Sequence, residues 1–224
     1  MGEGAARLEV PIEQGRVSGA LKREFPGLRL RYAVVEARPG RTPRGVRERL
    51  RYVASRLHGR RALNLRREPI ASAYRVFFRH IGLDPDEVRT PIEAIVLERL
   101  RVGGFRSHGI VDDALTLAIV ETGVAMRALD ADRTTGRLHL RLSQPGERLG
   151  GEDRGLELPP DSLVLADDNC AQGLIFGETA PGAEVDRGTR RITVVATQVD
   201  GVPDISVEEA IWICADALAG AEAV

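Results

Sequence analysis

The chain is almost free of lysine. Among its 32 lysine and arginine residues only Lys22 is a lysine, and 33 aspartates and glutamates bring the net charge to −1. A near-neutral chain argues against nucleic-acid binding through bulk positive charge, which usually appears as a strongly basic domain. Coding bias toward arginine is the simpler explanation of the missing lysine, although the planar guanidinium also suits phosphate groups.

Cysteine and histidine are also scarce. Two cysteines, Cys170 and Cys214, are too few for a disulfide scaffold and lack the spacing of a zinc site, so we interpret them as buried free thiols. The four histidines form no metal-binding pair, and we expect neither a metal nor another cofactor.

Long apolar runs are missing too. No stretch approaches the roughly 18 uncharged residues of a membrane span, and the first residues lack the hydrophobic segment of a signal peptide. We therefore expect a cytoplasmic protein without a membrane partner. Two common enzyme signatures are also absent, the G-x-S-x-G elbow of esterases and the phosphate-binding P-loop.

Helical spacing of apolar residues dominates the first half of the chain, after a strand predicted over 28–36. Thr42 and Pro43 have the character of an N-cap and a first-turn proline, and a capping box spans Thr90 to Glu93. Three aromatic residues in the predicted helix over 70–81 are better explained by core packing than by base stacking. The predicted helices cover 43–57, 70–81, 91–102 and 110–119.

Alternating and short apolar segments dominate the second half. They predict strands over 138–142, 163–166, 174–176 and 192–197, followed by a helix that a capping box at Ser206–Glu209 opens. Because helices precede strands instead of alternating with them, we expect an α+β fold with the helices packed on an antiparallel or mixed sheet or barrel. No linker divides the chain, so we expect one domain over 1–224.

Arginines crowd the predicted helix that follows Pro43 and the segment after it. A solvated helix face is the default interpretation of such a charge run, and an RNA-facing stripe is the alternative. The candidates for RNA contact are Arg44, Arg47, Arg51, Arg60 and Arg61.

Three acidic sites are candidates for ligand binding. Asp112 and Asp113 open a helix, where capping is the simpler role. Asp168 and Asn169 close an apolar strand, where an Asx-turn is an equal alternative. Glu178 follows Gly177 directly after an apolar segment, and a carboxylate there can accept a hydrogen bond from a ligand hydroxyl or pair with an ammonium group.

The order and spacing of five segments resemble the B3/B4 editing domain in the β subunit of bacterial phenylalanyl-tRNA synthetase and the free-standing proteins built on it. The likeness covers about 69–196 and depends on order more than on any one motif. The segments are Gly109–Asp112, Gly123–Asp130, Ser143–Glu147, Leu165–Asp167 and Phe176–Glu178.

The resemblance implies a tRNA-binding ester hydrolase, an aminoacyl-tRNA deacylase that removes tyrosine from the phenylalanine tRNA, and not a complete synthetase. It implies that Glu178 senses the phenolic hydroxyl, and that backbone groups and substrate hydroxyls replace a side-chain nucleophile, so no catalytic residue is assigned. The substrate-binding residues expected on this basis are Glu178, Gly177, Asp168, Asn169, Arg127 and Asp112.

The chain departs from the family pattern at several positions. Arg127 replaces a histidine, Ala125 replaces a proline, and His108–Gly109 stand in place of an asparagine. These changes leave a second hypothesis open, a non-catalytic module that binds an amino acid or small metabolite on the same fold. The sequence predicts neither the amino acid nor the oligomeric state.

Overall fold

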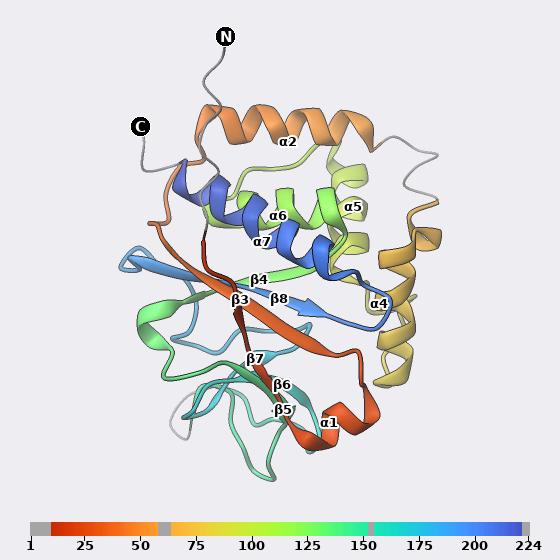
Figure 1. Ribbon diagram of the computed structural model, residues 1–224. Helices are drawn as coiled ribbons and strands as arrows, with labels where there is room; N and C mark the ends of the chain where they lie inside the picture. The colour runs from red at the N-terminus through yellow and green to blue at the C-terminus, as the bar shows by residue number, and fades with distance from the viewer. Residues whose placement is uncertain (1–9, 58–63, 152–154, 221–224) are drawn as a thin grey trace.

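The computed structural model of the protein describes residues 10–57, 64–151 and 155–220. Figure 1 shows the layers: helices lie over one face of a twisted sheet, and a second, smaller sheet lies beneath the other face. The α+β prediction is confirmed. The described strands form two separate open sheets of four strands each, so the barrel alternative is not realised.

The first sheet is antiparallel throughout, and its order β1-β3-β8-β4 places the longest strands at its centre. Seven of the eight residues of β8 are buried because both faces of this strand are covered. Strand β4 lies at the edge and is paired only with β8. The strands are β1 Glu13–Gln14, β3 Arg29–Glu36, β8 Arg191–Gln198 and β4 Ala125–Asp130.

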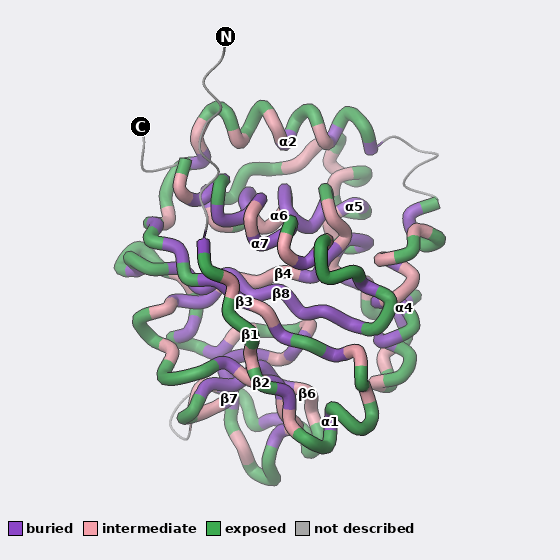
Figure 2. Tube along the Cα trace, in the orientation of Figure 1, coloured by how far each residue is buried: buried purple, intermediate pink, exposed green. Residues whose placement is uncertain are grey.

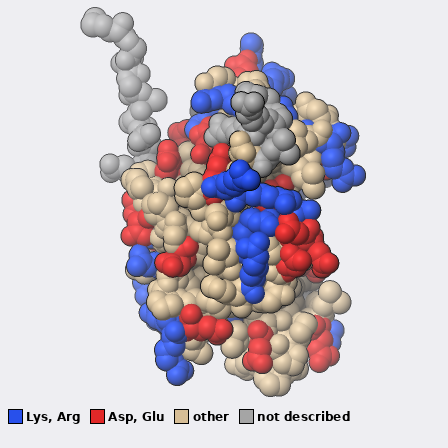
Figure 3. All heavy atoms as spheres, turned by 90° about the vertical axis from the view of Figure 1, so that its right-hand side faces the viewer, with Lys and Arg blue, Asp and Glu red and all other residues tan. Residues whose placement is uncertain are grey.

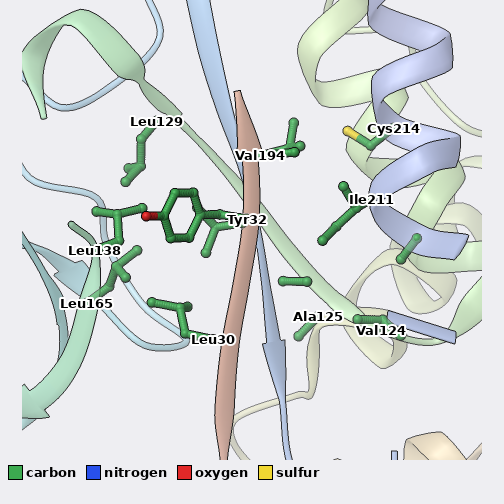
Figure 4. Packing of buried hydrophobic residues seen from close by; sticks show 14 of the residues in the cluster. Leu30, Tyr32, Val124, Ala125, Leu129, Leu138, Leu165, Val194, Ile211 and Cys214 are labelled. Atoms are coloured by element: carbon green, nitrogen blue, oxygen red, sulfur yellow. The ribbon is translucent and has the colours of Figure 1, made fainter. Parts of the chain in front are cut away.

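The second sheet has the order β2-β5-β6-β7, with β2 parallel to β5 and the other pairs antiparallel. Leucines and Tyr32 fill the space between the two sheets, with Leu30 and Leu129 facing Leu138 and Leu165 (Figure 4). The strands are β2 Arg16–Val17, β5 His139–Leu142, β6 Leu163–Ala166 and β7 Ala171–Leu174.

Helices α6 (Ile110–Thr122) and α7 (Asp204–Ala219) cover the outer face of the first sheet. Helix α2 (Arg44–Arg56) lies across α6 as a further, largely exposed layer (Figures 1 and 2). Helices α4 and α5 lie at one end of the first sheet (Figure 1). The remaining elements are α4 Pro69–His80, α5 Pro91–Val102, α1 Gly19–Glu24, η1 Leu65–Arg67 and η2 Ala131–Arg133.

The helix predictions for the first half are confirmed, and local signals explain them. The capping box is present, since the Thr90 N–H donates to Glu93 Oε2 at 3.3 Å. Gly103 and Gly123 end α5 and α6 with φ of 78° and 80°, a left-handed conformation that glycine adopts without strain. The aromatic residues of α4 are buried as predicted, with Tyr74 and Phe78 fully inaccessible.

Two predicted helix starts are wrong. Thr42 does not cap α2, because its buried hydroxyl donates to the Asp113 carboxylate, and Pro43 takes the N-cap position. The Ser206–Glu209 capping box does not open α7, which begins at Asp204 after Pro203. The Asp204 carboxylate instead accepts a hydrogen bond from Gln198 Nε2 at 2.6 Å.

The strand predictions need two corrections. Of the predicted strand 174–176 only Leu174 is in a strand, as the last residue of β7. The chain turns over 175–177, where Phe176 packs among the aromatic rings of α4. Strand β4 was not predicted, nor were the short β1, β2 and α1.

Both cysteines are free, as predicted, but only Cys214 is buried; Cys170 is half-buried. Burial raises the pKa of the Cys214 thiol to about 12, which leaves it unreactive at neutral pH. Among the described residues no helix is long and apolar enough to cross a membrane, and no group of three or more potential ligands is placed to hold a metal ion.

Candidate functional site

The first turn of α6 forms one wall of a hollow beside the edge strand β4. Gly109 precedes the helix with φ 127°, and the Ile110 N–H donates to the Gly40 carbonyl at 3.0 Å. A Cβ atom at Gly109 would lie 3.2 Å from that carbonyl oxygen. Glycine therefore allows the segment at 39–40 to approach the helix start closely.

The buried side chain of Asp113 holds this wall in place. Its buried carboxylate accepts hydrogen bonds from the hydroxyls of Thr42 and Ser107, which lie 3.0 Å from each other. The two hydroxyls belong to the loops before α2 and before α6. A single carboxylate at the positive end of α6 thus fixes both loops that border the hollow.

The floor is edge strand β4, through Met126, Arg127 and Ala128. The Arg127 side chain reaches toward the end of β7, where Nη2 donates to the carbonyls of Ile175 and Gly177 at 3.3 and 3.1 Å. Burial lowers the pKa of the Arg127 guanidinium to about 10, which still leaves it charged at neutral pH.

A tight turn after β7 forms the next wall. Three interactions hold it: the Leu174 N–H donates to the Glu178 carbonyl at 2.9 Å, Arg127 binds two carbonyls, and Phe176 inserts among aromatic rings of α4. Phe176 lies 4.7 Å from Phe78 between ring centroids. The turn is therefore anchored in the core on one side and presents Gly177 to the hollow on the other.

The loop after this turn closes the fourth side. Asp130, at the end of β4, accepts a hydrogen bond from the Thr189 hydroxyl at 2.6 Å, and its N–H donates to the Ala183 carbonyl at 2.9 Å. These bonds hold the segment that carries Glu184 and Val185 against the edge strand.

Together these four segments border an open cavity of about 560 Å³, a size typical of small-molecule sites. Its lining combines apolar side chains with one half-buried cation and two carboxylates. The lining residues are Pro39, Gly40, 108–112, Leu115, 126–128, Gly177, Thr179, Glu184 and Val185.

The structure brings three of the predicted binding residues together at this cavity: Asp112, Arg127 and Gly177. Glu178 is exposed at the rim, between two lining residues, and does not itself line the cavity. Asp168 and Asn169 are exposed in the turn between β6 and β7 and do not line it either.

The turn at 167–170 has a structural explanation. Burial acts to raise the pKa of the Asp167 carboxyl, but hydrogen bonds from the backbone N–H groups of Cys170, Thr135 and Asn169 together hold it below its ordinary value. Asp167 therefore forms the Asx-type turn that the sequence offered as an alternative, with Asn169 N–H to Oδ1 at 2.8 Å.

Sequence reasoning missed Gly40, Glu184 and Val185, which line the cavity from loops. No local motif marks them, because only long-range contacts bring these loops to β4. The packing of the Arg127 guanidinium against Gly173 was also not predicted. This close approach, in which a Cβ atom at Gly173 would overlap Arg127 Nη1, is visible only in the structure.

The predicted RNA-contacting arginines of α2 are exposed, although Arg44 forms an ion pair with Glu48 at 2.7 Å. Arg47 and Arg51 line a second hollow of about 370 Å³ with Arg99 and Phe105. Predicted residues Arg60 and Arg61 lie outside the described residues.

The charges on the side of the molecule that carries α4 and α5 are of mixed sign. Figure 3 shows a column of basic side chains bordered by acidic ones on this side. Asp86 alone forms ion pairs with Arg66, Arg75 and Arg89, at 2.9, 2.9 and 3.4 Å. Hydrogen bonding to Arg75 is the main reason that the pKa of the Asp86 carboxyl is lowered. This side is therefore not a uniformly basic surface.

The fold and the cavity define a class, an α+β domain with a small-molecule-sized site at the edge of its main sheet. A family model described as the B3/4 domain matches residues 73–206. The chain belongs to this B3/4 domain family. The match includes the first turn of α6, β4 and the Gly177 turn, whereas Gly40 lies outside it.

Curated relatives agree with this assignment. The phenylalanine–tRNA ligase β subunit of Leifsonia xyli is 30% identical over 128 residues, which cover 57% of this chain and 15% of that protein. The corresponding subunit of Anaeromyxobacter dehalogenans is 35% identical over 106 residues, 46% of this chain and 13% of that protein. The similarity thus spans only a small part of the length of these relatives.

Proposed function

We propose that the protein recognises the aminoacyl end of a mischarged tRNA and hydrolyses its ester in trans. The observation that carries the proposal is the 560 Å³ cavity, because most of its lining falls inside the B3/4 match and it has room for an amino-acid moiety. The relatives named as phenylalanine–tRNA ligase subunits support a tRNA-linked role.

The lining suits an amino acid with an apolar side chain. Val111, Leu115 and Met126 offer an apolar surface against which such a side chain can pack. The carboxylate of Asp112 is exposed at the same cavity and can pair with the ammonium group. Glu178 at the rim is the proposed reader of a side-chain hydroxyl.

The proposed reaction needs a water molecule and a site for developing negative charge. Water adds to the ester carbonyl carbon, the bond from that carbon to the ribose oxygen breaks, and the ribose oxygen takes a proton. The N–H groups of Val111 and Asp112 in the first turn of α6 can stabilise the oxyanion, since a helix N-terminus carries partial positive charge.

We expect the purified protein to hydrolyse tyrosyl ester on phenylalanine tRNA faster than phenylalanyl ester, and Glu178→Ala to remove this preference. A polar group matched to a substrate hydroxyl discriminates strongly against the analogue that lacks it. Release of radiolabelled amino acid measures both rates. Glu157→Ala, at an exposed glutamate outside the cavity, is the matched control. If the wild-type protein hydrolyses neither ester, the catalytic part of the proposal is wrong.

The position of α2 suggests where the tRNA backbone continues. The loop after α5 lines the arginine-containing hollow through Phe105 and Ser107, and the next residues, His108 and Gly109, line the cavity. The two hollows are thus adjacent along one loop. We propose that the tRNA backbone passes from the cavity to this second hollow. A terminal nucleotide at the cavity would then place the preceding phosphates near Arg47 and Arg51.

Replacing both Arg47 and Arg51 with alanine should weaken tRNA binding and reduce the slope of log affinity against log salt by about 1 to 2, because fewer phosphates are neutralised. Gel-shift titrations at several salt concentrations provide the measurement. Arg23→Ala on α1, at a different end of the molecule from α2, should leave the slope unchanged (Figure 1). An unchanged slope in the double variant would place the RNA elsewhere.

One observation favours a second candidate, an amino-acid-binding module without catalysis. An ester lacks the free carboxylate that the positive charge of Arg127 is suited to meet. A binding module should gain thermal stability from a free amino acid by mass action.

A further inference from the structure

We propose that Arg127 and the first turn of α6 form a subsite for a free carboxylate, so that the cavity binds an apolar α-amino acid as its zwitterion. The inference rests on the proposed function in placing an amino-acid moiety in this cavity, and it adds the ionic form of the ligand. That form is the product of the proposed hydrolysis, in which a neutral ester becomes a carboxylate.

The positive charge of Arg127, which lines the cavity, has no counter-ion among the described residues. None of their carboxylates is recorded within ion-pair distance of the guanidinium, and its Nη1 atom, inaccessible to solvent beside Gly173, has no hydrogen-bond partner there. Arg75 provides the contrast, because this buried arginine pairs with Glu93 at 2.7 Å and Asp86 at 2.9 Å. Charged groups inside proteins are ordinarily paired, so an unpaired one lining a cavity points to an anionic ligand.

The guanidinium of Arg127 is also held in a fixed position. Gly173 leaves space for Nη1 on one side, and the carbonyls of Ile175 and Gly177 hold Nη2 on the other. A cation fixed in this way attracts a carboxylate without losing further side-chain freedom.

The helix terminus on the facing wall also favours an anion. Gly109 supplies no side-chain cap to the 13-residue helix α6. The N–H groups of Val111 and Asp112 have no hydrogen-bond partner in the described part of the chain, and both residues line the cavity. Unpaired N–H groups of a first turn favour an anion, so they add to the attraction of Arg127.

The charges at the cavity distinguish a free amino acid from its ester. The carboxylates of Asp112 and Glu184 are exposed at the same cavity and can meet an ammonium group. An aminoacyl ester satisfies these acidic groups but leaves the Arg127 charge unpaired. A free amino acid satisfies both, and the apolar lining then selects its side chain.

The test compares amino acids with their carboxamides, which keep the ammonium and side chain but lose the negative charge. Isothermal titration of wild-type protein with phenylalanine, tyrosine, leucine and methionine should show at least one that binds tenfold or more tightly than its amide. Equal affinity of acid and amide throughout, or no binding of any of the four acids, would overturn the proposal without recourse to any variant.

Arg127→Met should reduce the acid-to-amide affinity ratio to about 1, while Arg187→Met, at an exposed arginine of the neighbouring loop, should leave it unchanged. Gly173→Ala should also lower the ratio by displacing the guanidinium, whereas Gly45→Ala, where the added Cβ meets nothing, should not. Circular dichroism melting shows whether each variant is folded. A ratio that survives in folded Arg127→Met contradicts the assignment.

The outcomes separate this inference from the proposed function. Strong preference for the free acid without deacylation would support the carboxylate subsite and end the hydrolase proposal. Deacylation with no preference for the acid over the amide would do the reverse. If both proposals hold, the free amino acid should inhibit deacylation competitively and its amide should do so at least tenfold less well.

Discussion

Asp113→Ala is expected to lower the free energy of unfolding by about 3 kcal/mol and to abolish ligand binding in the cavity. The buried carboxylate accepts hydrogen bonds from Thr42 and Ser107, and bonds to a charged group contribute about 1.5 to 3 kcal/mol each. Its removal releases the loop at 39–42 and the loop at 103–109 from the start of α6. Urea unfolding measures the stability, and titration calorimetry measures the binding.

The neighbouring residue supplies the control for Asp113. Asp112 is in the same helical turn and carries the same charge, but it is exposed and no hydrogen bond to its carboxylate is present among the described residues. Asp112→Ala should therefore cost only the helix-dipole contribution, about 0.3 to 1 kcal/mol. Asp113→Asn keeps one acceptor oxygen, so its loss of unfolding free energy should lie between those of Asp112→Ala and Asp113→Ala. Equal losses of unfolding free energy in Asp112→Ala and Asp113→Ala would contradict the role assigned to the buried carboxylate.

Glu93→Ala should destabilise the protein by about 3 to 5 kcal/mol, without direct effect on the cavity. Removing one member of a buried ion pair leaves the other uncompensated, and here that is the buried Arg75, which Glu93 contacts at 2.7 Å. The change also breaks the capping box with Thr90 at the start of α5.

An exposed glutamate of the same helix is the comparison for Glu93. Glu98→Ala should change the unfolding free energy by less than about 0.5 kcal/mol, as is usual for surface substitutions. Denaturant unfolding gives both values. A loss below about 1 kcal/mol for Glu93→Ala would show that Asp86 alone compensates Arg75, at its distance of 2.9 Å.

Local sequence signals predicted much of the fold because they act over a few residues. The Thr90–Glu93 capping box and the glycine after α6 decide helix ends within one turn, and the structure has them as predicted. Where a side chain has a distant partner the same signals failed. Thr42 was predicted to cap α2, yet its hydroxyl is bonded to a carboxylate 71 residues away.

Strand β4 was missed for a related reason. Ala125 to Asp130 has no clean alternation, because this edge strand packs against α6 and also forms the cavity floor, where Met126, Arg127 and Ala128 are all half-buried. The segment forms a strand because its backbone pairs with β8, a long-range contact that the local sequence pattern does not show. The side chains of a strand that borders a cavity depart from the rule of alternation between buried and exposed positions.

The lining of the candidate site was predictable in part. Order and spacing indicated Asp112, Arg127 and Gly177, which the structure brings to one cavity, but not Gly40 or Glu184, which arrive from loops through tertiary contacts. The chemistry of Arg127 was the least accessible from sequence. Its charge becomes informative only when burial and the absence of a counter-ion in the described structure are known.

The most direct test of the account is a crystal structure with a non-hydrolysable 3′-amide analogue of tyrosyl-adenosine. We predict its amino-acid portion in the cavity, with the ammonium near Asp112 and the side chain over Leu115 and Met126. Occupancy of another hollow, such as the 260 Å³ one lined by Phe25 and Phe77, with this cavity left empty at saturating analogue, would contradict the central claim.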